Sequence, residues 1–369
     1  MEAQKPARLD ALTGLRCFAA LNIVFFHFSN PDWFGQLSPV VNAGYLSVSF
    51  FIMLSGFVLA YNYAGRARLN KDDPHRLSKV RFWKARITRL YPVYLLSLVL
   101  GFQTFLGERA AHTTHMFWLG TFLTPLLLQG WIPEIATFGN TPAWTMSAEA
   151  AYYAIFPWIA ALKPPPRLAG HLWRLGVLWL LGMIPGTLYV IFNPDGIAQV
   201  DRFSSAPWLQ ALKFTPLPHL PSFVFGVLLA GLDEIVERSG WLRVGLGLLG
   251  FAGIYMILVQ GPRVPYALSH DGLLMPLFGC LILGLAGTNL LSRFFGFRAF
   301  VFVGESSYCL YLMHFNLWNL LHASGVLPAL GLARFDPWIS YVILVGLGLL
   351  TLHLVEKPAQ KVLRQWMGA

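Results

Sequence analysis

Charged residues are scarce in this sequence. Asp, Glu, Lys and Arg make up 12% of the 369 residues, where a soluble domain typically has about 25%. Apolar residues reach 56%, compared with about 45–50% in a soluble domain. A composition this poor in charge excludes an ordinary cytosolic enzyme.

Cysteine is also rare, with three residues in the chain. Cys17, Cys280 and Cys309 all lie inside apolar segments, and their spacing matches neither a disulfide framework nor a metal site. We interpret them as packing residues and expect no metal.

A small-residue cleavage site is missing after the first apolar run, Ala11–Phe28. This run is therefore predicted to be a retained helix rather than a signal peptide.

Long apolar runs are what the sequence has in abundance. A bilayer-spanning helix needs about 20 mostly apolar residues, and Leu172–Phe192 and Val301–Leu321 are long enough. Hydropathy indicates eleven apolar segments, at 12–29, 44–62, 83–106, 115–129, 145–161, 172–192, 217–232, 241–259, 272–290, 299–320 and 337–355. We expect an all-α polytopic membrane protein, with one transmembrane domain over residues 1–369 and no appended soluble domain.

The net charge of +10 is concentrated between positions 61 and 91. Only Asp72 and Asp73 oppose the basic residues there, which are Arg66, Arg68, Lys71, Arg76, Lys79, Arg81, Lys84, Arg86 and Arg89. A basic run can bind nucleic acid, but one between two membrane spans is typical of a cytoplasmic loop under the positive-inside rule. We therefore expect no nucleic-acid partner, and we place this loop in the cytoplasm together with Lys5 and Arg8.

The later loops test the number of spans. If segment 115–129 crossed fully, every later basic group would lie outside, namely Lys163, Arg167, Arg174, Arg238, Arg243, Arg293, Arg298, Lys357, Lys361 and Arg364. If it does not cross, all of them become cytoplasmic, as the positive-inside rule requires. We predict about ten spans with both termini inside. Segment 115–129 is then re-entrant or interfacial and covers a site, because irregular backbone at membrane depth must be buried in protein or line a cavity.

Two ionisable side chains lie in the first predicted span, where such groups are costly and by default mark function. Arg16 and His27 are eleven residues apart, which on an ideal helix is about 16 Å of rise and about 20° of rotation. They therefore share one face, with Arg16 near the cytoplasmic end and His27 near the outer end. The structural alternatives are an arginine that snorkels to the interface and a buried histidine that bonds to a neighbour.

Further polar groups fall at two depths. Glu149 and His314 are predicted in the outer part of the membrane with His27, whereas Arg86 and Arg89 share a helix face at the inner side with Arg16. Guanidinium groups match phosphate geometry, and histidine titrates near neutral pH. Two such poles indicate a two-substrate enzyme, with an anionic donor inside and a hydroxyl-bearing acceptor deprotonated outside. Glu149 is expected to orient the imidazole or hold the acceptor, unless it forms a structural ion pair.

These residues resemble the acyltransferase-3 family of bacterial membrane acyltransferases along nearly the whole chain. The matching segments, in order, are Arg16–His27, Phe50–Phe57, Arg86–Tyr94, Trp144–Glu149, Leu217–Phe223, Ser307–His314 and Glu356–Pro358. Each motif is short and weak alone, whereas their order and spacing together are specific. Thr145 and Met146 are mild departures from the family's Trp-Ser-Leu-x-x-Glu motif.

The resemblance implies transfer of an acyl group, usually acetyl, from cytoplasmic acyl-CoA to a glycan or another hydroxyl-bearing molecule. By position, His27 becomes the catalytic base or the acyl carrier, and Glu149 a second catalytic candidate. Arg16, Arg86 and Arg89 become the acyl-CoA contacts. Possible additional site residues are Ser147, Tyr308 and His314. The location implied is the bacterial cytoplasmic membrane, with membrane lipid as a partner and acyl-CoA as a substrate rather than a bound cofactor.

Other readings remain open on the sequence alone. The acceptor could be a small lipophilic molecule, such as an antibiotic or a lipid. A transporter of an anionic metabolite would also use arginines, but no internal repeat of the kind found in many transporters is visible. A structural or sensory protein would leave Arg16, His27 and Glu149 unexplained. The acyl chain length, the oligomeric state and the choice between base and acyl carrier for His27 are not encoded in these motifs.

Overall fold

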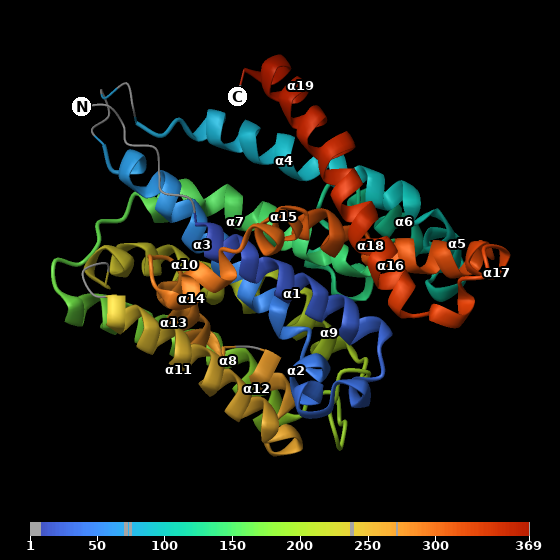
Figure 1. Ribbon diagram of the computed structural model, residues 1–369, viewed down its shortest axis with the longest axis horizontal. Coiled ribbons are helices and arrows are strands. Elements are labelled where there is room, and N and C mark those ends of the chain that lie inside the picture. Colours follow the sequence, from blue (N-terminus) through green and yellow to red (C-terminus); the bar gives the residue numbers. More distant parts are fainter. Residues whose placement is uncertain (1–8, 70–72, 74–75, 237–239, 271, 369) are drawn as a thin grey trace.

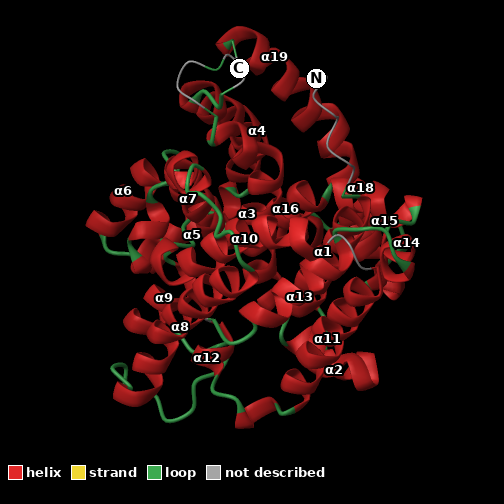
Figure 2. Cartoon of the chain, turned by 90° about the vertical axis from the view of Figure 1, so that its left-hand side faces the viewer, coloured by secondary structure: helices red, strands yellow, loops and turns green. Residues whose placement is uncertain are grey.

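The computed structural model describes residues 9–69, 73, 76–236, 240–270 and 272–368. Its regular elements within these ranges are all helical, with no strand (Figures 1 and 2). The expected all-α fold is therefore confirmed. Several charges used to predict the topology lie outside the described residues, namely Lys5, Arg8, Lys71, Asp72 and Arg238.

The longer helices form the body of the molecule (Figure 1). They are α1 (Asp10–Phe28), α3 (Leu46–Ala67), α4 (Lys79–Leu100), α7 (Trp144–Ala160), α8 (Leu168–Phe192), α10 (Pro216–Val236), α11 (Gly240–Val259), α16 (Ser307–Ala323) and α18 (Trp338–Thr351). Shorter helices connect or extend them: α2 (Ser38–Asn42), α5 (Phe102–Ala111), α6 (Thr114–Leu123), α9 (Pro207–Phe214), α12 (Tyr266–His270), α13 (Met275–Leu285), α14 (Leu290–Phe295), α15 (Arg298–Glu305), α17 (Val326–Ala329) and α19 (Lys357–Met367).

Irregular helical turns complete the described part of the chain. Six are 3₁₀-helices, at Pro31–Leu37, Gln129–Trp131, Pro133–Ile135, Thr141–Ala143, Gly261–Arg263 and Ala333–Phe335. The segment Leu352–Glu356, between α18 and α19, is a π-helix. Such segments are rare and are frequent at functional sites.

By length and hydropathy, fewer of the described helices qualify as membrane spans than the sequence predicted. Among the described residues, seven helical stretches are long and apolar enough to cross a membrane, and the pair α4–α5, bent by 67°, makes up to eight. Helices α7 and α16 have 17 residues each and fall just short of the 18 residues required. The multi-pass membrane fold is confirmed, whereas the exact count of ten is not.

Segment 115–129 begins as the short helix α6 and then breaks into turns. Ten residues of helix rise about 15 Å, which is half of the roughly 30 Å hydrocarbon core. The turns after it are tied to the protein interior, because Tyr94 Oη donates to the Thr124 carbonyl at 2.5 Å and Gln129 Nε2 donates to the Ala143 carbonyl at 3.1 Å. This segment is too short to cross, as the charge argument required.

Helix α1, which carries Arg16 and His27, is held by close backbone contact. A methyl group on Gly14 would clash with the Phe295 carbonyl of α14, and one on Gly304 of α15 would clash with the Thr13 carbonyl of α1. Small residues at such crossings let membrane helices pack backbone to backbone. The site helix is therefore fixed along its inner half.

The C-terminal helix α19 lies beside the start of α4 (Figure 1). Lys84 Nζ in α4 donates to the Met367 carbonyl at the end of α19 at 2.6 Å. The basic entry to α4 and the basic tail therefore lie on the same side of the molecule. This arrangement agrees with the charge argument, which placed both of them on one side of the membrane.

Candidate active site

A cavity of about 120 Å³ lies between five helices of the bundle, and we call it the arginine cavity. It is lined from α1, α3, α4, α7 and α16, and its polar and charged lining residues are Arg16, Ser55, Arg86, Arg89, Thr145, Glu149, Tyr153, Ser307, Tyr308 and Tyr311. On α3 the lining runs from Val48 to Leu59, a rise of about 16 Å. The cavity is therefore elongated along the helix axes.

The three arginines of this cavity differ in what they contact. Arg86 is buried, donates from Nη2 to the Tyr63 hydroxyl at 3.3 Å, and has its guanidinium 5.6 Å from the ring centres of Tyr63 and Phe82. Arg16 and Arg89 are half-buried and have no hydrogen bond or ion pair with any described residue. A cation inside an apolar bundle is costly unless it is paired. The carboxylates of Glu149 and Glu356 act on both guanidiniums through space, but neither makes a direct ion pair with them, so the donors of Arg16 and Arg89 stay open to a ligand.

Glu149 shares the arginine cavity. Its carboxylate accepts a hydrogen bond from the Tyr153 hydroxyl at 2.9 Å, and its charge interacts with those of Arg89, Arg16 and Arg86. The sequence grouped Glu149 by depth with His27 and His314, but the structure places it with the arginines. The carboxylate therefore does not orient the His27 imidazole.

Glu356 is a second carboxylate near the arginines; it was matched to the closing family motif in the sequence but was not named there as a site residue. It is 6% exposed and accepts hydrogen bonds from the Cys309 thiol and from Gln360 Nε2, both at 3.0 Å. Its charge acts on Arg16 and Arg89, and it ends the π-helix. The available signal was an acidic residue directly after the last apolar segment.

His27 and His314 meet at the other end of α1. His314 is fully buried, and its Nδ1 lies 2.5 Å from the Tyr311 carbonyl. His27 is exposed, and its Nδ1 lies 2.9 Å from the Ile23 carbonyl and 3.2 Å from His314 Nε2. The two rings come from positions 287 residues apart.

These contacts determine which ring nitrogens carry hydrogen in the neutral pair. A carbonyl only accepts hydrogen bonds, so Nδ1 of each ring is the protonated nitrogen. His314 Nε2 is then an acceptor, and His27 Nδ1–H is shared between it and the Ile23 carbonyl. The remaining nitrogen, Nε2 of His27, is the unprotonated and therefore basic atom of the pair.

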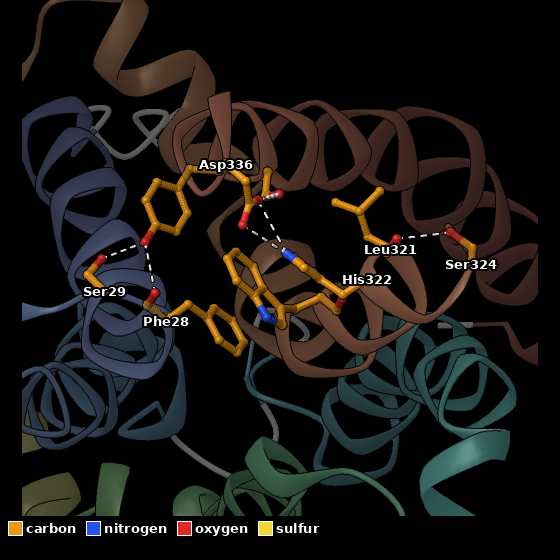
Figure 3. A network of polar contacts seen from close by, with 9 residues as sticks. Phe28, Ser29, Leu321, His322, Ser324 and Asp336 are labelled. Atoms are coloured by element: carbon orange, nitrogen blue, oxygen red, sulfur yellow. Dashed lines mark hydrogen bonds and ion pairs between the residues drawn. The ribbon is translucent and has the colours of Figure 1, made fainter. Parts of the chain in front are cut away.

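The backbone just after His27 is held by a polar and aromatic network (Figure 3). The Tyr341 hydroxyl donates to the Phe28 carbonyl at 3.1 Å and lies 2.6 Å from Ser29 Oγ. The Phe28 ring stacks on Trp318 at 4.1 Å, and Trp318 in turn stacks on His322. His322 pairs with Asp336 at 3.2 Å, as the dashed lines in Figure 3 show. The outer end of α1 is thus fixed against α16 and α18.

Tyr311 connects the arginine cavity with the histidine pair. Its side chain lines the cavity, and its carbonyl accepts from His314. One turn earlier, Tyr308 also lines the cavity and donates from its hydroxyl to the Leu90 carbonyl at 2.8 Å, next to Arg89. Helix α16 therefore spans the distance between the two predicted poles.

Ser147 does not line the arginine cavity. It is fully buried, donates to Gln129 Oε1 at 2.9 Å and accepts from the Gly130 N–H at 3.1 Å. The Ser147 hydroxyl thus both donates and accepts, and these two bonds hold the end of segment 115–129 and the residue after it against α7. The structure therefore gives this candidate residue a supporting position. In the described part of the chain no three His, Cys, Asp or Glu side chains are grouped to hold a metal ion.

Comparison with known proteins places these features in context. Residues 9–352 match the family model of the acyltransferase domain (Acyl_transf_3). The chain is 31% identical to acyltransferase MdmB of Streptomyces mycarofaciens, over 84% of this chain and 78% of that protein. It is 21% identical to O-acetyltransferase OatA of Staphylococcus aureus, over 88% of this chain. It spans only 53% of the length of OatA. No solved structure matches the chain.

Proposed function

This chain belongs to the acyltransferase-3 family, and we propose that it moves an acyl group from acyl-CoA to a hydroxyl of a glycan. One observation carries the proposal: two guanidiniums that make no hydrogen bond or direct ion pair with the described residues lie at one end of an elongated cavity, and an oriented histidine base lies beyond the other end. Neither feature is needed for a merely structural membrane bundle, in which unpaired buried charge is a cost.

The donor is proposed to bind at the arginine end. Arg16 and Arg89 supply the cations that the phosphates of acyl-CoA need, and guanidinium groups bind phosphate in a bidentate manner. The cavity then leads along α3 over about 16 Å. Its narrow, partly apolar walls suit the pantetheine arm, which carries the thioester toward the histidine pair.

The acceptor is proposed to react at His27. Nε2 of His27 takes the proton of the acceptor hydroxyl as its oxygen attacks the thioester carbonyl. The C–S bond then breaks, and the departing CoA thiolate receives that proton from the imidazolium. His314 keeps Nδ1 of His27 as the hydrogen-bearing nitrogen throughout, in the way that a third group orients the base in other acyltransfer sites.

The orientation in the membrane follows from the loop charges. The basic entry to α4 and the basic tail lie on one side of the molecule, and the positive-inside rule assigns that side to the cytoplasm. We place the chain in the bacterial cytoplasmic membrane with both termini inside. Cytoplasmic acyl-CoA then enters at the arginine end, and the acceptor is acylated in the outer compartment.

The test is acyl transfer by His27→Ala protein in proteoliposomes supplied with radiolabelled acetyl-CoA and a crude cell-envelope glycan fraction. We expect transfer to fall by about a thousandfold, the loss typical of a missing general base, while acetyl-CoA still binds. Transfer that continues at the original rate would exclude His27 as the base. A radiolabelled acyl group trapped on wild-type His27 without acceptor would replace direct transfer by a covalent relay.

A further inference from the structure

A second, larger cavity opens beside the outer end of α1, and we call it the outer cavity. Its volume is about 720 Å³. Its walls come from the α2–α3 junction, the end of α8, the loop after α8 and the segment before α12, and they share no residue with the arginine cavity. Nothing described above assigns it a ligand.

The lining of the outer cavity combines aromatic rings with amides. Four aromatic side chains contribute to it: Tyr45, Tyr189, Phe203 and Tyr266. Phe203 is 77% exposed, so its ring is open to a molecule in the cavity. The amides of Asn42 and Gln199 are exposed and make no side-chain hydrogen bond within the described ranges. Amides both donate and accept.

The charges in the outer cavity balance. Asp201 and Arg202 are adjacent and of opposite sign. Hydrogen bonds from Ser204 and Phe203 lower the pKa of the Asp201 carboxyl, so that it stays ionised. Its Oδ1 accepts all of these bonds, from the Phe203 N–H at 2.9 Å and from the N–H and hydroxyl of Ser204 at 2.8 Å each. Oδ2 is left as a free acceptor in the part of the chain that the structure describes.

The loop that carries these groups is held in place. Lys213 is 4% exposed and donates to the carbonyls of Ser204 at 2.9 Å and Arg202 at 3.4 Å. Asp195 accepts from the Leu209 N–H at 2.9 Å and from the Tyr189 hydroxyl at 3.0 Å. A wall built before binding saves the ordering cost that a flexible loop would add.

The outer cavity ends next to the base. Arg202 donates to the Phe26 carbonyl at 3.3 Å and lies 4.9 Å from the centre of the Phe26 ring. Tyr45 packs against the same ring at 5.8 Å. Both residues line the outer cavity, and Phe26 is the residue before His27. The charge of Arg202 also acts on His27, so this wall of the outer cavity lies near the imidazole.

We propose that the outer cavity binds an uncharged sugar unit of the acceptor and presents one of its hydroxyls to His27. A sugar has apolar C–H faces that pack on aromatic rings and hydroxyls that pair with amides and a carboxylate. An anionic acceptor would meet the Asp201 carboxylate, and a purely lipophilic one would leave Oδ2 and the two amides without partners. The inference rests on the proposed function, because it names the acceptor of the same reaction.

The experiment uses full-length His27→Ala protein in nanodiscs, so that binding is observed without turnover. Saturation-transfer NMR is recorded with the methyl glycosides of glucose, rhamnose and N-acetylglucosamine. We expect at least one of them to bind, and a Gln199→Ala/Phe203→Ala background to weaken binding roughly tenfold through the lost ring contact and hydrogen bond. The matched control, Gln365→Ala/Phe297→Ala, changes the same residue types at exposed positions elsewhere and should bind as the parent does.

Two results would overturn the sugar site: no glycoside binds the parent, or binding is equal in the cavity and control variants. The proposed function is judged separately, by transfer from acetyl-CoA with wild-type protein. Glycoside binding without any acetyl transfer would refute the function and leave the sugar site standing. Transfer to hexadecanol in the absence of glycoside binding would keep the acyltransferase and refute the sugar.

Discussion

The two ends of α1 differ in how their polar side chains are bonded. At the arginine end, Arg16 and Arg89 make no hydrogen bond or ion pair with the described residues. At the histidine end, both imidazoles are bonded, and the backbone beyond them is tied to two further helices. Polar groups left open await a ligand that supplies the missing partner, whereas a base must be held in one orientation before its substrate arrives. This contrast supports our proposal that the donor binds at the arginine end and that the chemistry takes place at the histidine end.

The largest effect that would separate the two ends comes from the open arginines. We expect the double change Arg16→Ala/Arg89→Ala to raise the KM for acyl-CoA by at least about a hundredfold, since each charged contact is worth about 1.5–3 kcal/mol. The KM for the acceptor should not move. Initial rates with each substrate varied in turn give both constants, and Arg16→Lys/Arg89→Lys is the control that keeps charge but not bidentate geometry. An equal rise in both constants would erase the division between the ends.

The next effect tests the orientation of the base. His314→Leu removes the acceptor for His27 Nδ1–H, and we expect kcat to fall by ten- to a hundredfold, as for other residues that hold a functional histidine. Both KM values should stay near those of the wild type. His314→Gln, whose amide oxygen can accept the same hydrogen bond, should recover part of the rate. If the Gln and Leu variants have the same kcat, the hydrogen bond from His27 to His314 does not matter and His314 serves only as a packing residue.

Glu149 gives a further test of the difference between the two ends, because the sequence placed it at the histidine end and the structure places it at the arginine end. Its carboxylate offsets the mutual repulsion of the cavity arginines. We expect Glu149→Gln, which can still accept from the Tyr153 hydroxyl, to lower the KM for acyl-CoA up to about tenfold, because the change removes a negative charge that repels the phosphates of the donor. A loss confined to kcat, or a change in the acceptor KM, would return Glu149 to the histidine end.

The smallest effect belongs to a residue outside both ends. Ser147→Ala removes two buried hydrogen bonds to the segment beneath α6, each worth about 1 kcal/mol of net stability. We expect a lower midpoint of thermal unfolding in detergent and unchanged kinetic constants. Ser147→Cys provides a similar volume with weaker bonding and should lie between. A selective kinetic defect in the folded Ala variant would move Ser147 into the catalytic machinery.

The sequence predicted those features of the site that depend on a single helix. The 3.6-residue period placed Arg16 and His27 on one face of α1, and Arg86 and Arg89 together on α4. The weak, short segment after position 115 was also predictable, because loop charges and length both argue against a crossing.

Contacts between helices were beyond that reasoning. The meeting of His27 with His314, the position of Glu149 among the arginines and the approach of Glu356 all depend on how distant segments pack. Depth estimated by counting residues from a predicted helix end also missed Glu149. That count ignored how the neighbouring helices are staggered, which only close packing decides.

The clamping of α1 has a consequence for the choice of donor. The inner half of α1 is packed against α14 and α15, and its outer end against α16 and α18. The separation between Arg16 and His27, the proposed phosphate ligand and the proposed base, is therefore fixed. The helix holds the two residues about 16 Å apart along its axis, the rise of eleven residues. The length of the arm that joins phosphate and thioester then selects the donor, whatever acyl group it carries. A thioester on a shorter arm would not reach from the arginines to His27.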